Sequence, residues 1–284
     1  KKILEIRIKR EQPGKDDKII TSWNGLMVSA FLSGYRITDN SKYLDAAKQS
    51  IDFFESNFEK NHILHRTFKN AEPKLNGYLD DYAYMANASV DMFENTSQPK
   101  YLLFATNLAN YLITHFWDDS SNGFFFTSDN HEKLIMRPKN NYDLSMPSGN
   151  SVAAYVLLKL HHITQNKQFF EIAKKIIESQ AISAAENPFA FGYLLNALYL
   201  YYQKPTEITI INDKNSELVS SLRKKFLPES IMVLVENQSN LEALSKHSFF
   251  SGKEFQNDKT TVFVCKNFSC SLPLSDLSEI EKEL

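Results

Sequence analysis

Glycine is scarce in this chain, which has eight glycines in 284 residues, well under half the usual share of about 7%. These glycines never lie closer than nine positions apart. The fingerprints G-x-G-x-x-G and G-x-x-x-x-G-K-[ST] therefore cannot be written anywhere in the sequence. Their absence excludes the dinucleotide-binding and P-loop chemistry that depends on those loops.

The sequence also lacks an excess of positive charge and a long apolar run. It has 32 Lys and Arg against 34 Asp and Glu, a net charge of −2, and no local run of basic residues, so we expect no nucleic-acid partner. The most apolar stretches, such as residues 189–202, are shorter than the roughly 20 residues of a membrane span. We therefore expect no transmembrane helix.

Cysteine is nearly absent, because Cys265 and Cys270 are the two in the chain. Two cysteines are too few for a disulfide scaffold, and without a signal peptide they are predicted to be reduced thiols in the cytoplasm. Four residues separate them, where a redox C-x-x-C motif has two. Two interpretations stay open: a buried structural pair, or a redox or metal role. The chain begins at Lys1 without an initiator Met, as expected of a processed or truncated segment.

A repeat organises the first two thirds of the chain. In each copy an aromatic residue follows a Thr by five positions, and an Ala follows the aromatic residue by four. The copies begin at Thr38, Thr96 and Thr164. Apolar residues at helical spacing surround each copy, which predicts a helix, a short turn and a second helix.

We predict three antiparallel helical hairpins and one helix without a partner, over residues 22–58, 79–117, 148–184 and 188–202. The connections 59–77 and 118–147 are long and are expected to form short β-hairpins or irregular loops. Loops of a helical repeat that lie on one face commonly carry its function.

The pattern changes after Pro205. Short β-branched runs predict strands at 207–211, 230–235 and 262–265, with helices at 217–226 and 275–284. The expected fold is therefore mainly α, with a helical-hairpin domain over 1–204 and a small α/β module over 205–284.

Three unusual peptides occupy equivalent positions at the start of the first helix of each hairpin. They contain Trp23 with Asn24, the run Asp80-Asp81-Tyr82, and Ser148 with Asn150. If the hairpins pack side by side, these helix ends converge on one mouth. One interpretation is that Ser22, Asp80 and Ser148 are N-caps, which leaves their aromatic, carboxylate and amide neighbours unexplained.

Aromatic rings beside carboxylates and amides suit a polyhydroxylated ligand, and two carboxyls with different pKa values could perform acid/base chemistry. Adjacent residues on a helix point about 100° apart, so Asp81 with Asp143 is a better predicted pair than Asp80 with Asp81. Arg137 and Lys139, in the loop before Asp143, are either solvated or paired with Asp143, and a local salt bridge is preferred to a substrate contact. The seven histidines form no ligand pattern, so neither a metal nor another cofactor is predicted.

Several separated motifs appear in the order of a known family. Residues 9–13, 17–27, 77–83, 122–125, 147–151 and 264–273 resemble the C-terminal half of the spermatogenesis-associated, thioredoxin-domain-containing protein family. The resemblance implies a longer protein with an N-terminal thioredoxin-like domain, an (α/α) toroid similar to six-hairpin glycosidases and N-acylglucosamine 2-epimerases, and a small tail domain. This chain departs from that pattern because it has neither the thioredoxin-like domain nor the earliest hairpins.

The toroid resemblance implies a carbohydrate-active or carbohydrate-binding domain with a sugar-like ligand. In the glycosidase-like hypothesis Asp80, Asp81 and Asp143 are the acid/base candidates. The ligand-binding candidates are Trp23, Asn24, Tyr82, Arg137, Ser148 and Asn150. An epimerase is disfavoured, since no histidine lies at the helix starts. The alternative hypothesis is a non-catalytic scaffold that supports a thioredoxin-like partner domain.

Overall fold

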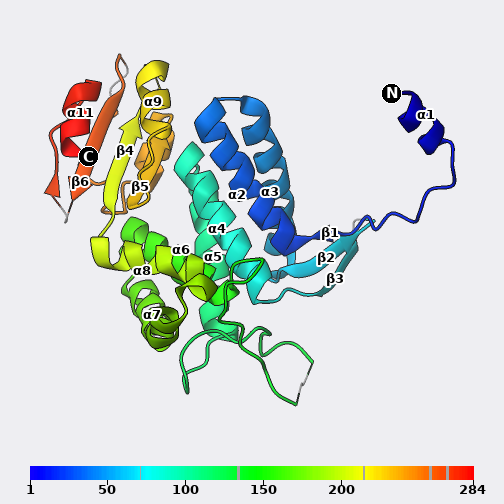
Figure 1. Cartoon of the computed structure of the whole chain (residues 1–284). Coiled ribbons are helices and arrows are strands. Elements are labelled where there is room, and N and C mark those ends of the chain that lie inside the picture. The colour runs from blue at the N-terminus through cyan, green and yellow to red at the C-terminus, as the bar shows by residue number, and fades with distance from the viewer. Residues whose placement is uncertain (71, 133–134, 214, 256–257, 267–268) are drawn as a thin grey trace.

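The protein is described by a computed structural model covering residues 1–70, 72–132, 135–213, 215–255, 258–266 and 269–284. Its larger part is an arc of antiparallel helices (Figure 1). The arc consists of the hairpins α2 (Thr21–Thr38) with α3 (Ser41–Asn61), α4 (Leu79–Thr96) with α5 (Pro99–His115), and α6 (Gly149–Thr164) with α7 (Lys167–Glu186), followed by the 3-10 turn η1 (Pro188–Phe191) and α8 (Gly192–Gln203). All three predicted hairpins and the extra helix are confirmed.

The repeated Thr closes the first helix of each hairpin. The hydroxyl groups of Thr38, Thr96 and Thr164 each donate a hydrogen bond to the carbonyl four residues earlier. The residue after each Thr has a positive φ, between 51° and 60°, which ends the helix in a left-handed cap. Asn40 and Asn166 then cap the following helices, whereas α5 begins with Pro99 directly after its N-cap residue Gln98.

The first helices of the hairpins form an inner layer. α2 packs on α4, α4 on α6, and α6 on α8, while α3, α5 and α7 each pack on the inner helix of their own hairpin. α4 lies at the centre of this arrangement, and nearly all of its residues are buried. The inner helices run parallel to one another, so their N-termini lie at the same end of the arc.

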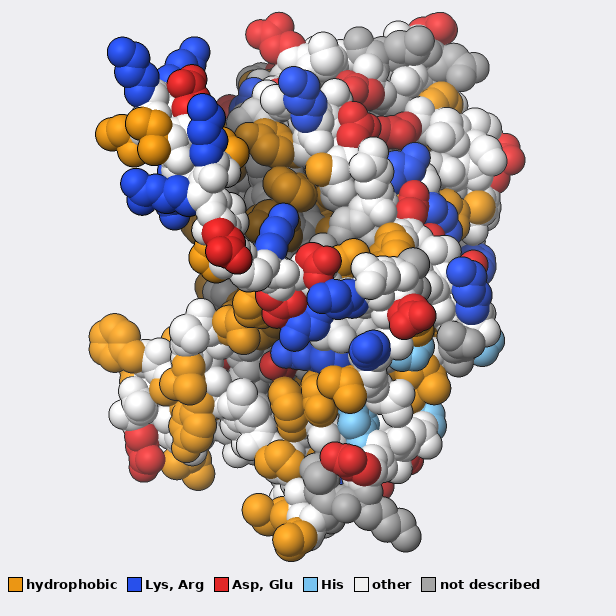
Figure 2. Space-filling model, turned by 90° about the vertical axis from the view of Figure 1, so that its right-hand side faces the viewer, with side chains coloured by type: hydrophobic (Ala, Val, Ile, Leu, Met, Phe, Trp, Pro, Cys, Tyr) orange, Lys and Arg blue, Asp and Glu red, His pale blue; other side chains and the backbone are white. Residues whose placement is uncertain are grey.

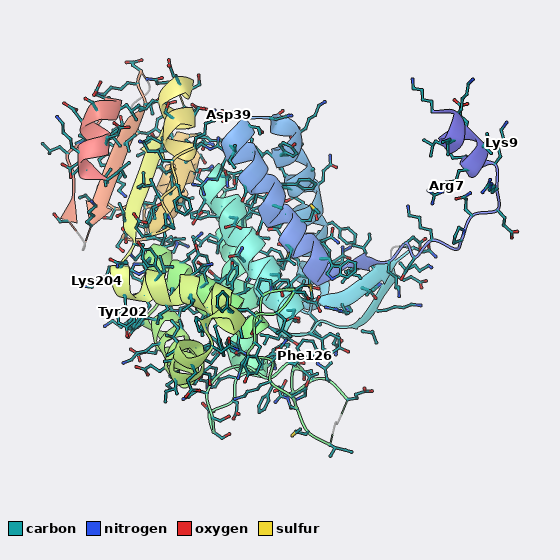
Figure 3. The ribbon with its side chains drawn as sticks, viewed as in Figure 1. Arg7, Lys9, Asp39, Phe126, Tyr202 and Lys204 are labelled. Carbon is teal, nitrogen blue, oxygen red and sulfur yellow. A yellow bond between two sulfur atoms is a disulfide. The ribbon has the colours of Figure 1, made fainter. Side chains whose placement is uncertain are left out.

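The two long connections lie at that end. The first contains β2 (His65–Lys69) and β3 (Glu72–Asn76), an antiparallel hairpin that β1 (Ile19–Ile20) extends. The second, residues 116–148, is irregular in its described parts, apart from a bridge between Trp117 and Phe124. Figure 3 shows Phe126 of this loop at the end of the arc opposite Asp39 and Lys204.

The C-terminal module is a four-stranded sheet in the order β5-β4-β6-β7. Its elements are β4 (Thr206–Ile211), α9 (Ser216–Arg223), β5 (Ser230–Val235), α10 (Gln238–Leu244), β6 (Thr261–Lys266), β7 (Ser269–Cys270) and α11 (Leu277–Glu283). The predicted strands and both predicted helices are present, whereas α10 was not predicted. The division at residue 204 stays a prediction, because one hydrophobic cluster joins Val233 and Phe263 of the sheet to the helical arc.

The predicted reduced state of the cysteines is wrong for this structure. Cys265 and Cys270 form a disulfide with Cα atoms 3.9 Å apart. The two residues are opposite each other on the antiparallel strands β6 and β7, so the hairpin brings the sulfurs together. Spacing in the sequence did not indicate this, because cross-strand register decides which side chains meet.

The N-terminal helix α1 (Lys2–Ile8) was not predicted and lies away from the arc (Figure 1). None of its residues is buried. Basic and acidic side chains are interspersed over the face shown in Figure 2. Within the described residues, no helix is long and apolar enough to cross a membrane.

Candidate functional site

The N-terminal turns of α2, α4 and α6 touch because glycine stands at the contacts. A Cβ atom at Gly25 of α2 would lie 2.8 Å from the carbonyl carbon of Tyr84. A Cβ atom at Gly149 of α6 would lie 2.6 Å from Oδ1 of Asp80 and from Cγ of Leu79. Neither position has room for a larger residue, so these glycines let the helix starts converge as predicted.

Asp81 holds the starts of α2 and α4 together. Its Oδ1 accepts the Ser22 N–H at 2.8 Å and its Oδ2 accepts the Tyr78 N–H at 2.8 Å. Arg66 Nη1 donates to the same carboxylate at 3.0 Å and to the Ser22 hydroxyl. Burial raises the pKa of Asp81, while Arg66 and the two backbone N–H groups oppose that rise. The side chain is 0% exposed, so this predicted acid/base residue is enclosed by its own partners.

Asp143 makes the equivalent connection between α6 and α8. Its Oδ1 accepts the Ser148 N–H at 2.7 Å, and its Oδ2 accepts the N–H groups of Tyr193 and Leu194. Asp81 and Asp143 thus each satisfy donors at two neighbouring helix starts, where a negative charge is favourable. Burial, and then the charges of Asp80, Asp143 and Asp81, raise the pKa of Tyr84, so all three carboxyls lie near its hydroxyl group, and the pairing of Asp81 with Asp143 stays a prediction.

The N-cap interpretation holds for one of its three residues. Ser148 caps α6 by accepting the Asn150 N–H. Ser22 lies inside α2, whose N-cap is Ile20, and Asp80 lies inside α4, whose N-cap is Tyr78. The capping of α2 and α4 is instead performed by Asp81, which no local pattern indicated because one of its partners is 59 residues away.

Three of the predicted ligand-binding residues are committed to internal contacts. Tyr82 is 1% exposed, stacks on Tyr111 at 4.6 Å, and accepts the Leu64 N–H. Asn150 is 0% exposed and bonds both the N–H and the carbonyl of Phe124. Ser148, also 0% exposed, donates to the Asn140 carbonyl. These contacts hold the connections over the helix ends.

Arg137 also serves the second connection. It donates to the carbonyls of Thr127 and His115, and its guanidinium lies 4.3 Å from the centre of the Phe125 ring. It makes no ion pair with Asp143 among the described contacts, so the predicted local salt bridge is wrong. Asn24 is partly buried and donates to the Ile20 carbonyl. Trp23 differs from these residues because it is 58% exposed.

Asp80 is the one predicted carboxyl without a full set of hydrogen bonds. Its Oδ1 is buried and has no hydrogen-bond partner of regular geometry, although it faces the start of α6 at Gly149. Burial and the neighbouring Asp81 charge raise its pKa from 3.8 to about 6, against the opposing effects of Arg66 and the Gly149 backbone. Asp80 therefore exchanges its proton close to neutral pH.

Two residues of this region were missed by the sequence analysis. Arg66 of β2 neutralises Asp81, and the Tyr84 hydroxyl donates to the Pro147 carbonyl, joining α4 to the start of α6. Neither lies in a distinctive motif, since each acts on a partner brought close by the fold. In the part of the chain that the structure describes, no group of three or more His, Cys, Asp or Glu side chains could hold a metal ion.

Comparison with known proteins gives a consistent picture. The sequence profile of glycosyl hydrolase family 76 matches residues 7–181. An uncharacterized protein of Caenorhabditis elegans is 26% identical over 97% of this chain and 39% of its own length. Human spermatogenesis-associated protein 20 is 25% identical over the whole chain and 38% of its own length. The chain is therefore homologous to spermatogenesis-associated protein 20 and spans less than two fifths of these relatives, which confirms the family resemblance.

The solved structure of the family 76 α-mannanase from Bacteroides thetaiotaomicron has a similar fold. It aligns with a TM-score of 0.53 and 14% identity, over 75% of this chain and 58% of the mannanase. The predicted mainly helical toroid, followed by a small sheet, is confirmed.

Proposed function

The chain belongs to glycosyl hydrolase family 76, and we propose that the converging starts of its inner helices bind a carbohydrate, with Asp80 as the reacting carboxyl. The observation that carries this proposal is the contrast among the three acids. Asp81 and Asp143 are saturated by helix N–H groups, whereas Asp80 keeps a buried oxygen without a regular partner. That oxygen, Oδ1, lies against the start of α6 at Gly149, so a ligand hydroxyl or glycosidic oxygen would bind the other carboxyl oxygen, Oδ2, of this partly buried residue.

The chemistry of Asp80 suits proton transfer to a glycosidic oxygen. A carboxyl with a pKa of about 6 remains partly protonated near neutral pH, as a general acid requires. Trp23, exposed on the first turn of α2, offers an aromatic face on which a sugar ring could stack. Because a structure of similar fold is an α-mannanase, α-linked mannooligosaccharides are the first ligands to test.

The experiment measures binding by calorimetry and hydrolysis by product analysis, using α-mannooligosaccharides and a panel of other glycans. We expect wild-type protein to bind, Asp80→Asn to lose turnover, and Trp23→Ala to lose affinity. Asp45→Asn and Ile37→Ala are matched controls because both residues are exposed and lie outside the inner-helix starts. Failure of the whole panel to bind, or equal effects from the controls, would overturn the proposal.

A non-catalytic scaffold is the second candidate function. The observation in its favour is that Asp81, Asp143 and Asn150 all bond backbone groups of helix starts or connections. It predicts that Asp80→Asn changes no ligand-dependent property. Hydrolysis of any glycan by wild-type protein, abolished in Asp80→Asn with folding intact, would exclude this candidate.

A further inference from the structure

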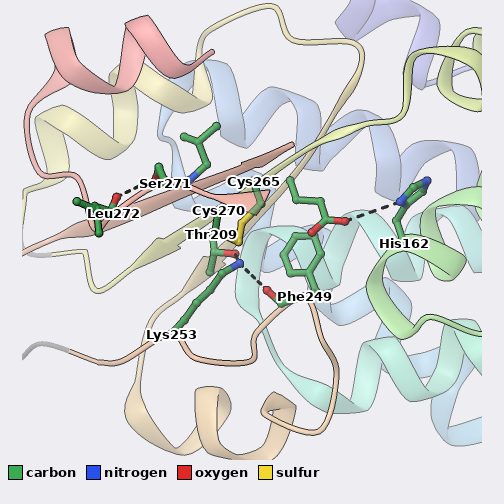
Figure 4. Close-up of a disulfide and its surroundings, with 10 residues drawn as sticks. His162, Thr209, Phe249, Lys253, Cys265, Cys270, Ser271 and Leu272 are labelled. Carbon is green, nitrogen blue, oxygen red and sulfur yellow. Dashed lines mark hydrogen bonds and ion pairs between the residues drawn. A yellow bond between two sulfur atoms is a disulfide. The ribbon is translucent and has the colours of Figure 1, made fainter. Parts of the chain in front are cut away.

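The Cys265–Cys270 disulfide lies on one face of the C-terminal sheet together with charged side chains. Cys265 of β6 is opposite Glu207 of β4, and Phe263 is opposite Thr209. Directly paired residues, and residues two apart on a strand, project to the same face. Cys265, Thr209 and Glu207 therefore share the face that carries the disulfide. Figure 4 shows Thr209 beside the two cysteines.

The two sulfur-bearing residues differ in access. Cys265 is 2% exposed, whereas Cys270 is exposed. Cys270 lines a cavity of about 260 Å³ together with Ser271, Leu272 and Lys253. A reagent in this cavity can therefore contact Cys270, whereas Cys265 is buried on the other side of the disulfide bond.

Lys253 places a buried positive charge on the same face. It is 8% exposed, and its Nζ donates to the Thr209 hydroxyl at 2.6 Å and to the Phe249 carbonyl (Figure 4). Among the described residues, no carboxylate lies within ion-pair distance of Lys253. Burial lowers its pKa to about 8, against the smaller opposing effect of the Glu207 charge. The carboxylate nearest in register to Cys265, Glu207, faces His162 Nδ1 at 3.8 Å.

We propose that the Cys265–Cys270 disulfide is a redox site that oxidises an external dithiol, with Lys253 stabilising the thiolate formed at Cys265. A cation lowers the pKa of a nearby thiol, and a thiol of lower pKa is a better leaving group in exchange. The buried ammonium gains a counterion when the disulfide opens. The site is independent of the carbohydrate proposal, because it lies on the C-terminal sheet.

The exchange proceeds in two balanced steps. A thiolate of the dithiol attacks Sγ of Cys270 and bonds to it, and the Cys265–Cys270 bond breaks with its electron pair passing to Sγ of Cys265. The second thiolate of the dithiol then attacks the first dithiol sulfur, and the released pair passes to Sγ of Cys270. The dithiol becomes a disulfide, and both cysteines are reduced. The two protons of the dithiol pass to the cysteine sulfurs or to water.

The test uses the full chain and dithiothreitol as the dithiol probe. Protein is incubated without denaturant, quenched with N-ethylmaleimide, and the blocked thiols are counted by mass spectrometry while circular dichroism monitors folding. We expect two thiols to appear in protein that stays folded. Resistance to dithiothreitol until denaturant is added would show an inert structural disulfide and overturn the proposal.

The role of Lys253 is tested by Lys253→Met, which we expect to slow reduction several-fold. Lys266→Met is the matched control, because Lys266 follows Cys265 on β6 and alternation directs it to the opposite face. Equal rates in wild-type protein and both variants would remove Lys253 from the proposal.

Single-cysteine variants test which sulfur is attacked. In Cys265→Ser the remaining Cys270 is expected to react with Ellman's reagent at least tenfold faster than the remaining Cys265 does in Cys270→Ser, because Cys265 is buried. The reverse order would overturn the assigned direction of attack. This comparison remains informative if Lys253→Met fails to fold.

Discussion

Replacing Asp80 with Asn is expected to make the protein more stable at neutral pH while it removes the proposed function. Folding moves this carboxyl from water into a site where burial and the Asp81 charge disfavour its ionised form. At pH 7 the folded protein must nevertheless hold it largely ionised. An amide of nearly the same shape carries no such penalty.

The magnitude follows from the pKa difference. Its pKa rises from 3.8 to about 6, and each unit corresponds to about 1.36 kcal/mol. The ionised side chain therefore costs at most about 3 kcal/mol of unfolding free energy at pH 7. The remaining exposure of Asp80 and the new polar contacts of Asn reduce the expected gain for Asp80→Asn to about 1–2 kcal/mol.

The sign of the pH dependence is fixed by the direction of the shift. A carboxyl whose folded pKa is raised penalises folding little below its unfolded pKa of 3.8, and the penalty grows until the pH passes about 6. The stability difference between Asp80→Asn and wild type should thus be small at pH 4 and reach its full value near pH 7.

Urea unfolding followed by circular dichroism at pH 4, 5.5 and 7 measures this difference, with Asp45→Asn as the exposed control. Hydrolysis or ligand binding is measured on the same preparations. If the variant is more stable but has lost function, Asp80 is a functional residue whose ionised side chain lowers the stability of the wild-type protein. If Asp80→Asn is less stable than wild type at pH 7, the carboxylate has a structural partner and the reasoning is refuted.

Three further substitutions are tested by chemical unfolding at pH 7, two at the inner-helix starts and one near the opposite ends of α4 and α6. Asp81→Ala leaves Arg66 and two helix N–H groups without their carboxylate. It should lower the unfolding free energy by about 3–5 kcal/mol. A decrease below about 1 kcal/mol would contradict the bridging role of Asp81. Gly149→Ala forces a Cβ atom into contact with Asp80 and should cost about 1–3 kcal/mol, whereas an unchanged midpoint would show that the helices separate freely. Lys159→Met removes the cation from Glu94, whose Oε1 lies 2.7 Å from Lys159 Nζ with both side chains 5% exposed. Because the carboxylate is then buried without a cation, we expect the unfolding free energy to fall by about 3–5 kcal/mol. The double variant Lys159→Met with Glu94→Leu should recover most of this loss.

The sequence by itself determined the hairpins, because their signals are local. The repeated Thr closes each inner helix within four residues of itself, and Asn40 caps α3 through its second neighbour. The seven-residue helices α1 and α10 were missed, although α11, which is equally short, was predicted. The order of motifs also identified the family, which the comparisons confirmed.

Tertiary structure alone decided which partners each of the two adjacent carboxyls has. Asp80 and Asp81 are adjacent and chemically identical, but α2 packs against one side of α4 and α6 against another. The Asp81 carboxylate therefore accepts hydrogen bonds from the N–H of Ser22 and from Arg66. The Asp80 carboxyl instead packs against the start of α6, where its Oδ1 is buried without a regular hydrogen-bond partner. The two cysteines likewise became a disulfide through strand register. Solvation, charge and bonding at these groups depend on neighbours many residues away, so local sequence could name the candidates but could not rank them.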